Sequence, residues 1–339
     1  SSNFSKPYTY GEYLSKGGYQ ISKKVKDNKI SKIDIINILN ESGLKGKGGA
    51  GFPTGKKWEI VSKFEGKKYI AINGDEGEPG TFKDRYYLEK DPHRFLEGLL
   101  IASDFINAHE VYIYIRDEYP SVIEILKKEI LILEKDKIIP ENFFIIRRGA
   151  GAYICGEESA MIESIEGKRG LPRHRPPYVA EVGLFGKPTL TNNLETIYWI
   201  RDIIEKGPNW FSEQGIRGRK GFHSFSVSGR VKNPGVKIAP AGTTVQELID
   251  KYCGGMIDGH EFKGYLPGGA SGGILPSSLN NIPLDYGSKE LDSEGCFLGS
   301  AAIVILSSKD NMMDVGLNLL KFFEEESCGQ CTPCRVGTE

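Results

Sequence analysis

The sequence predicts an α/β domain, then a smaller α+β domain, then a helical segment near the carboxyl end. Apolar strand patterns alternate with helical patterns from residue 68 to residue 165, which is typical of α/β folds. Residues 222–306 change character and combine short strands with many glycines. Residues 315–326 form an amphipathic helical pattern that leads into three closely spaced cysteines.

Length and composition are those of a globular protein. The 339 residues, of which 39% are hydrophobic, suffice for two or three domains. A net charge of −1 without a basic stripe gives no electrostatic reason to expect nucleic acid as a partner. No apolar run is long enough to span a bilayer and the amino end has no hydrophobic signal region. We therefore expect no direct membrane insertion and a cytoplasmic location, including the cytoplasmic face of a membrane complex.

Residues 46–58 concentrate glycines and lysines and form the first candidate ligand loop. Glycines can adopt φ > 0, so backbone N–H groups can approach a phosphate or a flat ring. Phe52 and Trp58 are residue types that stack on such rings. The pattern Gly-x-Gly-x-x-Gly is present at 46–51, but residues 33–39 favour a short helix over the strand that a Rossmann site requires. A flexible surface loop with solvated lysines is the alternative.

The strand expected at 68–72 runs into a turn rich in carboxylates. Asn73, Asp75, Glu76 and Glu78 follow the strand directly. Carboxylates at such a position commonly bind ribose hydroxyls, whereas a solvated turn is the alternative. A helix at about 95–106, a strand at 111–115 and a helix from 120 to about 133 follow.

A second glycine loop, residues 149–158, lies between a buried strand at 143–146 and a helix at 159–165. This context places free N–H groups and the positive end of a helix dipole at one point. Glu157 and Glu158 fall at the helix start, where a structural cap is equally expected for one of them. We interpret Cys155 as a packed thiol.

Residues 168–188 are rich in Pro, Gly and Arg and are expected to be extended. Residues 191–196 then open a helix that continues through residue 204. Adjacent asparagines, Asn192 and Asn193, stand at its start, so one is expected to cap the helix and one to remain free for a ligand.

In residues 222–306 we expect strands near 225–227 and 303–306 and a helix at 245–252. The glycine cluster at 267–273 is interpreted as a structural turn, with a third ligand loop as the alternative. After the final helix, Cys328, Cys331 and Cys334 form C-x-x-C-x-x-C, which suits an iron–sulfur cluster or, with a fourth ligand, zinc. An uninterrupted triple is more typical of iron–sulfur proteins, and the cysteine pattern favours a reducing compartment.

Six blocks of the sequence together resemble the NADH-binding flavoprotein subunit of respiratory complex I, a family shared with NAD-linked hydrogenases and formate dehydrogenases. In the family's order these blocks are residues 43–58, 73–80, 149–158, 183–188, 191–196 and 327–335. The resemblance implies an FMN- and NADH-binding α/β domain at 1–221 and a ubiquitin-like β-grasp domain at 222–306. It also implies the start of a helical iron–sulfur bundle at 307–339.

The resemblance also assigns roles to single residues, with FMN, NAD and a [4Fe-4S] cluster as cofactors. It places Phe52 and Tyr178 near the adenine, Glu78 on the adenosine ribose, and Glu76 and Glu158 close to the nicotinamide. Lys57 would stabilise the negative charge that develops on the flavin. The residues implied to hold FMN, with their loop neighbours, are Gly46, Gly48, Gly49, Ala50, Lys57, Asn73, Asp75, Tyr153, Gly156, Glu157, Asn192 and Asn193. The cluster ligands are Cys328, Cys331 and Cys334.

The implied function is oxidation of NADH through FMN within a larger redox complex that contains further iron–sulfur proteins, among them a thioredoxin-like [2Fe-2S] subunit. The parent complex is left open among respiratory complex I, a hydrogenase, a formate dehydrogenase and a bifurcating enzyme. The rival hypothesis is a non-redox nucleotide-binding module with a structural zinc site.

The sequence departs from the family pattern at several positions. Ile60 stands where an aromatic residue is usual, Tyr178 and Arg175 replace the common Phe and Lys, and Val336 replaces a frequent Glu. We therefore expect weaker stacking on adenine. A [4Fe-4S] cluster takes four ligands, and in the family the fourth follows further along the chain. Because the sequence stops at Glu339, we hypothesise that a longer polypeptide completes the bundle and the cluster.

Overall fold

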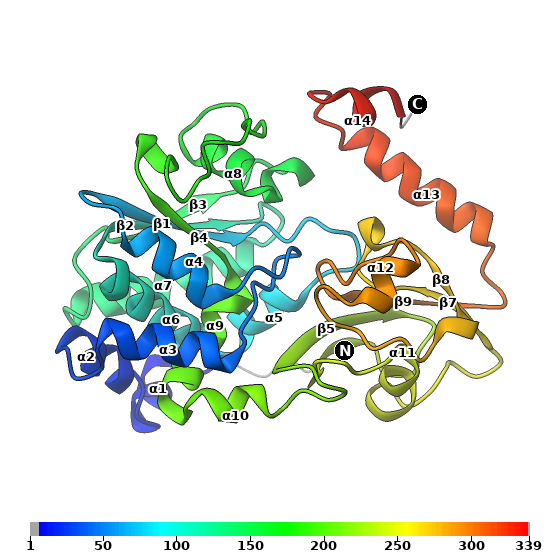
Figure 1. Ribbon diagram of the computed structural model, residues 1–339, viewed down its shortest axis with the longest axis horizontal. Coiled ribbons are helices and arrows are strands. Elements are labelled where there is room, and N and C mark those ends of the chain that lie inside the picture. Colours follow the sequence, from blue (N-terminus) through cyan, green and yellow to red (C-terminus); the bar gives the residue numbers. More distant parts are fainter. Residues whose placement is uncertain (1–6, 338–339) are drawn as a thin grey trace.

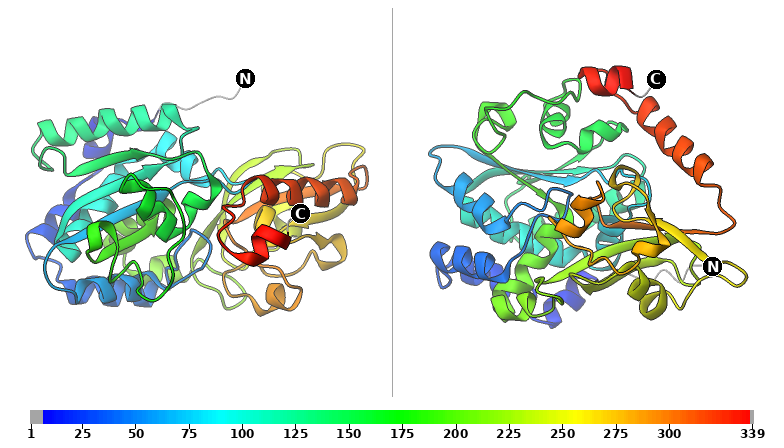
Figure 2. Two further views of the ribbon diagram at one scale, coloured as in Figure 1. Left: turned by 90° about the horizontal axis from the view of Figure 1, so that it is seen from above. Right: turned by 45° about the vertical axis from the view of Figure 1, so that its right-hand side comes forward.

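The computed structural model describes residues 7–337 and contains one parallel and one mixed β-sheet (Figures 1 and 2). The parallel sheet has the order β3-β2-β1-β4. Its direction of winding reverses between β1 and β4, and ligands of open α/β sheets bind outside the carboxyl ends of the strands at such a point. The strands are β1 (Lys68–Gly74), β2 (Ala108–Ile115), β3 (Phe144–Arg148) and β4 (Thr189–Asn193).

Helices alternate with these strands, which confirms the predicted βαβα order. Strand β4, however, was not predicted, because the expected helix start at 191–196 overlaps it. The helix begins at Leu194, with Asn193 as its N-cap. The helices of this part are α1 (Tyr10–Ser15), α2 (Gln20–Lys26), α3 (Lys32–Ser42), α4 (Thr54–Ser62), α5 (Lys83–Lys90), α6 (Pro92–Ile106), α7 (Pro120–Lys135), α8 (Glu158–Ile165), α9 (Leu194–Lys206) and α10 (Pro208–Ser212).

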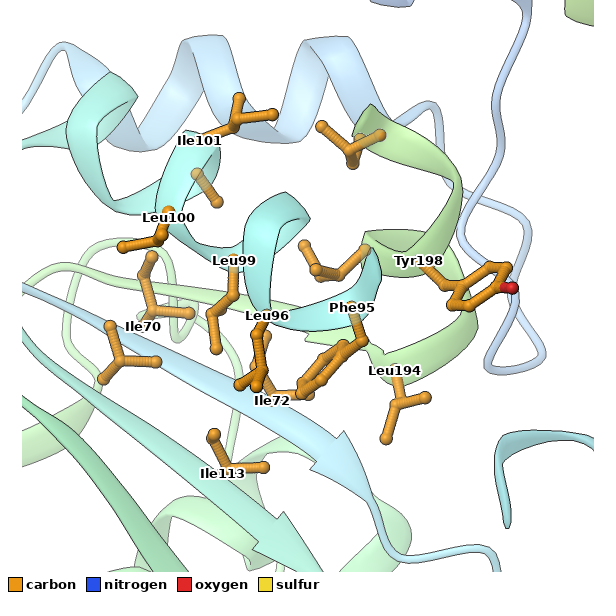
Figure 3. Close-up of a cluster of buried hydrophobic side chains, with 14 of the residues drawn as sticks. Ile70, Ile72, Phe95, Leu96, Leu99, Leu100, Ile101, Ile113, Leu194 and Tyr198 are labelled. Atoms are coloured by element: carbon orange, nitrogen blue, oxygen red, sulfur yellow. The ribbon is translucent and has the colours of Figure 1, made fainter. Parts of the chain in front are cut away.

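Both faces of the parallel sheet are buried. Ile70 and Ile72 of β1 belong to a core with α6 and α9 (Figure 3), whereas the alternate residues Tyr69 and Ala71 belong to a second core that includes Met161 of α8. Because successive side chains point to opposite faces, a strand covered on both sides is apolar throughout. This is why β1 and residues 111–115 of β2 were visible as apolar runs, whereas β3 ends in the exposed residues Arg147 and Arg148.

The second sheet, with the order β6-β5-β9-β7-β8, lies in residues 222–307, here called the mixed-sheet unit. Its β5–β9 pair is parallel and the other pairs are antiparallel. It has its own core, which includes Phe225 and Tyr265. The predicted helix at 245–252 is one turn of α-helix, α11 (Val245–Glu247), continued by a π-helical turn at 248–252, and α12 (Lys289–Ser293) follows. The strands are β5 (Phe222–Gly229), β6 (Gly235–Pro240), β7 (Phe262–Leu266), β8 (Leu275–Pro276) and β9 (Ala302–Ser307).

Beyond the mixed-sheet unit, α13 (Met312–Glu325) runs back toward the α8 side of the parallel sheet and leads to α14 (Thr332–Gly337) (Figures 1 and 2). Tyr153 contacts this segment twice. Its ring packs edge-on at 5.2 Å from that of Phe322, and its backbone N–H donates to Glu326 Oε2 at 2.9 Å. Among residues 7–337 no helix is long and apolar enough to cross a membrane.

Candidate functional site

A cavity of about 400 Å³ lies where the carboxyl ends of β1 and β4 meet the second glycine loop and the mixed-sheet unit. Its volume is in the range of small-molecule and cofactor sites. The residues that line the cavity come from loops in several parts of the chain. The lining residues are Lys47, Gly48, Gly49, Asn73, Asp75, Glu76, Gly77, Glu78, Thr81, Lys83, Asp84, Tyr153, Ile154, Gly156, Glu157, Asn193, Ser271, Phe297, Gly299 and Ser300.

The first glycine loop is a closed turn between α3 and α4. Its neck is held by the Gly46 N–H, which donates to the Phe52 carbonyl at 2.8 Å. Gly51 has φ +64°, and a Cβ there would lie 2.5 Å from Cβ of Tyr286, so only glycine fits. No strand precedes the loop within the described residues, as predicted, so it is not the first turn of a Rossmann unit.

Lys47 anchors this loop to the mixed-sheet unit. Its side chain is buried, with Nζ donating to the Phe222 carbonyl at 2.5 Å and lying 3.0 Å from His223 Nδ1. His223 Nε2 lies 2.9 Å from Asp285 Oδ1. Burial lowers the pKa of Lys47 to about 8, and burial together with the charge of Lys47 lowers the pKa of His223 to about 4. At neutral pH a neutral His223 thus accepts from Lys47 and donates to Asp285.

Among the carboxylates after β1, Glu76 is committed to structure. It is buried and accepts from the backbone N–H groups of Asp84, at 2.8 Å, and Arg85, at 3.2 Å, at the start of α5. The Tyr119 hydroxyl donates to it at 3.1 Å. Burial and the neighbouring charge of Asp84 raise the pKa of Glu76.

Asp75 lines the cavity, and one of its carboxylate oxygens has no protein donor among the described residues. Within the described part of the chain its Oδ2 is buried and has no hydrogen-bond partner. Burial raises the pKa of Asp75 to about 7, against the opposing charge of Arg116. An unpaired buried acceptor is costly, and a ligand hydroxyl would satisfy it.

Glu78 reaches across to the mixed-sheet unit. Its Oε1 accepts from the backbone N–H and the hydroxyl of Ser271, both at 2.7 Å. The Tyr153 hydroxyl donates to Oε2. The glycine cluster at 267–273 is therefore more than the structural turn expected from sequence, because it contributes Ser271 to the cavity wall.

The second glycine loop has the predicted strand–loop–helix context, and its two glutamates have different partners. Glu157 is the N-cap of α8 and accepts from the N–H groups of Ser159 and Ala160. Glu158 lies 3.2 Å from Lys57 Nζ and accepts from the Thr191 hydroxyl at 2.7 Å. Although burial opposes its ionisation, these contacts hold the pKa of Glu158 below its usual value.

The asparagines at the end of β4 are both engaged. Asn193 caps α9 by accepting from the Glu195 N–H at 3.0 Å, and it lines the cavity. Asn192 is buried and accepts from Trp58 Nε1 at 3.0 Å. Trp58 is itself fully buried, so the expectation that it stacks on a ligand ring is wrong.

The cavity brings together most of the residues implied by the family resemblance. The predicted residues that line it are Gly48, Gly49, Asn73, Asp75, Glu76, Glu78, Tyr153, Gly156, Glu157 and Asn193. Phe52 and Tyr178 are exposed aromatic residues outside its lining. The other predicted residues outside the lining are Gly46, Ala50, Lys57, Glu158 and Asn192.

Sequence reasoning missed two groups of lining residues. Lys83 and Asp84 form a buried ion pair at 2.8 Å, and Lys83 also lies 3.1 Å from Glu195. Although burial opposes its charge, Asp84 and Glu195 raise the pKa of Lys83, so this cation persists. The adjacent Lys83 and Asp84, which follow the carboxylate turn in the sequence, could have indicated this ion pair. The second group comes from the mixed-sheet unit and comprises Ser271, Phe297, Gly299 and Ser300. Ser271 belongs to the glycine cluster at 267–273, for which a third ligand loop was the alternative interpretation, whereas the other three have no local signal.

Of the three clustered cysteines, Cys328 and Cys331 lie in the loop between α13 and α14, and Cys334 lies in α14. Cys334 Sγ lies 3.1 Å from the Ser327 hydroxyl, and Cys331 is exposed. Their thiols are the donors that an iron–sulfur cluster requires. Among residues 7–337, no three Cys, His, Asp or Glu side chains are already grouped as a metal site.

Comparison with known proteins identifies the family. The family described as "Nuo51 FMN-binding domain" matches residues 39–202, the "SLBB domain" family matches 224–275, and the "NADH-ubiquinone oxidoreductase-F iron-sulfur binding region" matches 314–339. The F subunit of NADH-quinone oxidoreductase from Aquifex aeolicus (strain VF5) is 44% identical over 338 residues, covering 97% of this chain and 77% of that protein. The chain belongs to the family of NADH-quinone oxidoreductase F subunits. The predicted family and the FMN and [4Fe-4S] regions are thereby confirmed.

Further relatives in this family span bacteria and eukaryotes. The F subunit from Escherichia coli (strain K12) is 39% identical over 341 residues, covering 98% of this chain and 76% of the relative. NADH dehydrogenase [ubiquinone] flavoprotein 1, mitochondrial, of Dictyostelium discoideum is 40% identical over 348 residues, covering 97% and 72%. A crystal structure of an NAD+-reducing [NiFe]-hydrogenase in the air-oxidised state matches with a TM-score of 0.81 and 33% identity over 91% of this chain. This chain spans about half, 52%, of that hydrogenase chain.

Proposed function

We propose that this chain is an NADH-oxidising flavoprotein that holds FMN in the cavity between the parallel sheet and the mixed-sheet unit. Family membership supplies the class of reaction. The observation that carries the assignment to this cavity is the buried Oδ2 of Asp75, which has no partner among the described residues. Asp75 belongs to a wall that combines glycine backbone and asparagine amides with charged side chains, namely Glu76, Glu78, Asp84, Glu157, Lys47 and Lys83. FMN presents hydroxyls for such an acceptor and a flat ring for the glycine loops.

The protein groups around the cavity fit FMN. Gly48 and Gly49 bring backbone without side chains to the wall, and Asn73 is held in place by donating to the Gly156 carbonyl at 2.7 Å. Asn193 packs against Gly48, where an added Cβ would lie 3.1 Å away. Flavin chemistry supplies acceptance of a hydride and release of electrons one at a time. The chain supplies orientation and a low-dielectric wall with fixed charges.

Two aromatic residues outside the cavity lining would contact the nucleotide. Phe52 and Tyr178 are 43% and 58% exposed, so both are available to contact adenine at the surface.

Lys57 would stabilise negative charge on the flavin, and Glu158 holds its ammonium at 3.2 Å. Glu76 would act near the nicotinamide mainly by fixing the start of α5, since its oxygens are already accepting hydrogen bonds.

The wider assignments are proposals as well. The parallel β5–β9 pair in the mixed sheet supports a β-grasp fold for residues 222–306, with 1–221 and 307–339 as the flanking domains. Cys328, Cys331 and Cys334 are proposed as cluster ligands on donor type and spacing. Other iron–sulfur proteins, among them a thioredoxin-like [2Fe-2S] subunit, are the proposed partners, at the cytoplasmic face of a membrane complex. The contact of Glu326 with Tyr153 supports nearness of the cysteine segment to the cavity.

Anaerobic titration of the purified protein with NADH tests the proposal. We expect a flavin absorption spectrum that bleaches on addition of NADH. At pH 8, above the raised pKa of Asp75, we expect the FMN dissociation constant to rise about tenfold or more in Asp75→Asn, because a charged acceptor is lost. Asp117→Asn is the matched control, since Asp117 pairs with Arg148 and does not line the cavity. A protein that contains zinc, binds no FMN and shows no absorption change with NADH would instead support the non-redox hypothesis.

A further inference from the structure

We propose that Glu326 is a positioning residue that docks the cysteine segment, defined as residues 312–337, on Tyr153, and that filling the cavity and docking this segment stabilise each other. The inference rests on the proposed function, in which the cavity holds FMN. It gives a residue outside the cavity lining a part in binding the cofactor. It also connects the cofactor site with the segment that carries the three clustered cysteines.

Tyr153 contacts the cavity wall and the cysteine segment at the same time. Its hydroxyl donates to Glu78, and both of these residues line the cavity. Its backbone N–H donates to Glu326 Oε2 at 2.9 Å, although the two residues are 173 positions apart. Its ring lies edge-on to that of Phe322, with the ring centres 5.2 Å apart. A change in the position of Tyr153 is therefore felt in both regions.

The backbone N–H of Tyr153 is a donor that its own turn leaves free. Residues 153–156 form a 3₁₀ turn, and the first N–H groups of a helical turn have no acceptor within it. The Glu326 carboxylate supplies an acceptor, and hydrogen bonds to charged groups are stronger than those between neutral groups. Glu326 directly follows α13, so this bond fixes the end of the helix from which the loop with Cys328 and Cys331 starts.

The same turn forms part of the cavity wall. The Gly156 carbonyl accepts from Asn73 Nδ2 at 2.7 Å, which ties the turn to the end of β1. A molecule that fills the cavity restricts the motion of the turn, and it thereby lowers the entropy cost of holding Tyr153 against Glu326. The lining residues from the turn and its end are Tyr153, Ile154, Gly156 and Glu157.

The cysteine segment buries little of its own surface, so a modest change in free energy is enough to dock or release it. No residue of α13 or α14, both of which lie within the described part of the chain, is buried. Besides Glu326, the Gln330 side chain contacts the rest of the chain by donating to the Pro172 carbonyl at 2.7 Å. Segments with few buried contacts open readily. Because linkage is reciprocal, docking strengthens FMN binding by the same factor by which FMN favours docking.

The test measures amide hydrogen exchange and FMN affinity in the full chain, with and without FMN, for the wild type, Glu326→Ala and Glu326→Gln. Glutamine keeps an acceptor oxygen without the charge. Exchange is followed in α13, which does not line the cavity, so FMN does not protect these amides by direct contact. Glu325→Ala is the matched control, because it removes the same charge from an exposed neighbouring position. Wild-type exchange in β1 shows that each variant folds.

We expect FMN to slow exchange in α13 of the wild-type protein by about fivefold or more, the lower end of typical coupling between sites. Glu326→Ala should abolish this protection and raise the FMN dissociation constant by the same factor. Glu326→Gln should retain part of both effects, and Glu325→Ala should match the wild type. If the wild-type protein binds FMN, exchange in α13 that is unchanged by FMN, or wild-type FMN affinity in Glu326→Ala, would overturn this inference alone. A wild-type protein that binds no FMN would overturn the proposed function itself.

Discussion

Replacing Lys47 by Met is predicted to release FMN while changing global stability little. Lys47 is buried and joins the first glycine loop to Phe222 and His223. Methionine has a similar length and no charge, so it fills the space without the two polar contacts. The loop then loses its anchor to the mixed-sheet unit, although its neck at Gly46 and Phe52 stays closed.

Two opposing terms determine the effect on stability. The Phe222 carbonyl and His223 Nδ1 each lose a donor, and an unsatisfied buried polar group costs about 1–3 kcal/mol. In the other direction, the buried ammonium disappears. The fall in the pKa of Lys47 from 10.5 to about 8 corresponds to roughly 3 kcal/mol of unfavourable charge burial. The two unsatisfied groups together cost about 2–6 kcal/mol, so against a gain of roughly 3 kcal/mol we expect the free energy of unfolding to change by between a rise of about 1 and a fall of about 3 kcal/mol.

Flavin affinity is the sensitive observable, because Gly48 and Gly49 of the same loop line the cavity. We expect the FMN dissociation constant, measured by quenching of flavin fluorescence, to rise by at least about tenfold, which equals about 1.4 kcal/mol. Lys45→Met is the matched control. Lys45 pairs with Asp285 at 3.6 Å on a partly exposed surface, and such pairs contribute only about 0–1 kcal/mol. Wild-type FMN affinity in Lys47→Met, with the urea midpoint also unchanged, would show that the loop holds its shape alone.

Three further predictions concern single side chains. Lys57→Ala should slow hydride transfer and weaken flavin retention by a few kcal/mol at most, since it removes a preorganised charge held by Glu158; full FMN occupancy with an unchanged rate of NADH oxidation would contradict its assignment. Glu78→Gln should raise kcat/KM for NADPH by about tenfold, because it removes a repulsion of roughly 1–3 kcal/mol between the carboxylate and the 2′-phosphate. An unchanged ratio of kcat/KM for NADPH to kcat/KM for NADH would place the ribose away from Glu78. Burial lowers the pKa of His223 from 6.5 to about 4, so between these pH values the unfolded chain binds the proton that the folded chain does not. Stability should therefore fall as pH drops from 6.5 to about 4, by up to roughly 3 kcal/mol from this group, and urea unfolding of His223→Asn should lack that part of the slope.

The sequence predicted strands well where both faces of the strand are buried. Strands β1 and β2 are buried on both faces over residues 69–72 and 111–115, so the apolar runs there are continuous. The predicted ranges 68–72 and 111–115 lie inside the observed strands but leave out residues 73–74 of β1 and 108–110 of β2. Strand β4 was missed although it is buried as well. Its residues Thr189, Thr191, Asn192 and Asn193 are polar, and several of them hydrogen-bond α8, Trp58 and the start of α9, so the strand end has the composition of a helix start. The strand was therefore missed because its polar residues make hydrogen bonds within the fold, and of these four residues Asn193 also lines the cavity.

For the site, residues close to strand ends were predictable and residues supplied by tertiary contact were not. Topology alone brings the turn after β1 and the end of β4 together, because parallel strands end at one edge. Nothing near Ser271 in the sequence indicates that a carboxylate 193 residues earlier will accept its hydrogen bonds. The family resemblance supplied the remaining assignments, and its aromatic residues Phe52 and Tyr178 lie outside the cavity lining.

The carboxylate turn after β1 shows that acidic residues close together in a sequence can have different roles, which the sequence alone does not distinguish. Asp75, Glu76 and Glu78 stand close together along the chain, yet each has a different environment. Glu76 caps α5, Glu78 is fixed by Tyr153 and Ser271, and Asp75 keeps a buried oxygen without a partner in the described residues. Because leaving an acceptor unsatisfied is costly, the unpaired Asp75 is the one of the three whose environment a bound ligand completes. The other two already accept hydrogen bonds from protein donors, so their main part in the site is to keep the wall around that ligand in place.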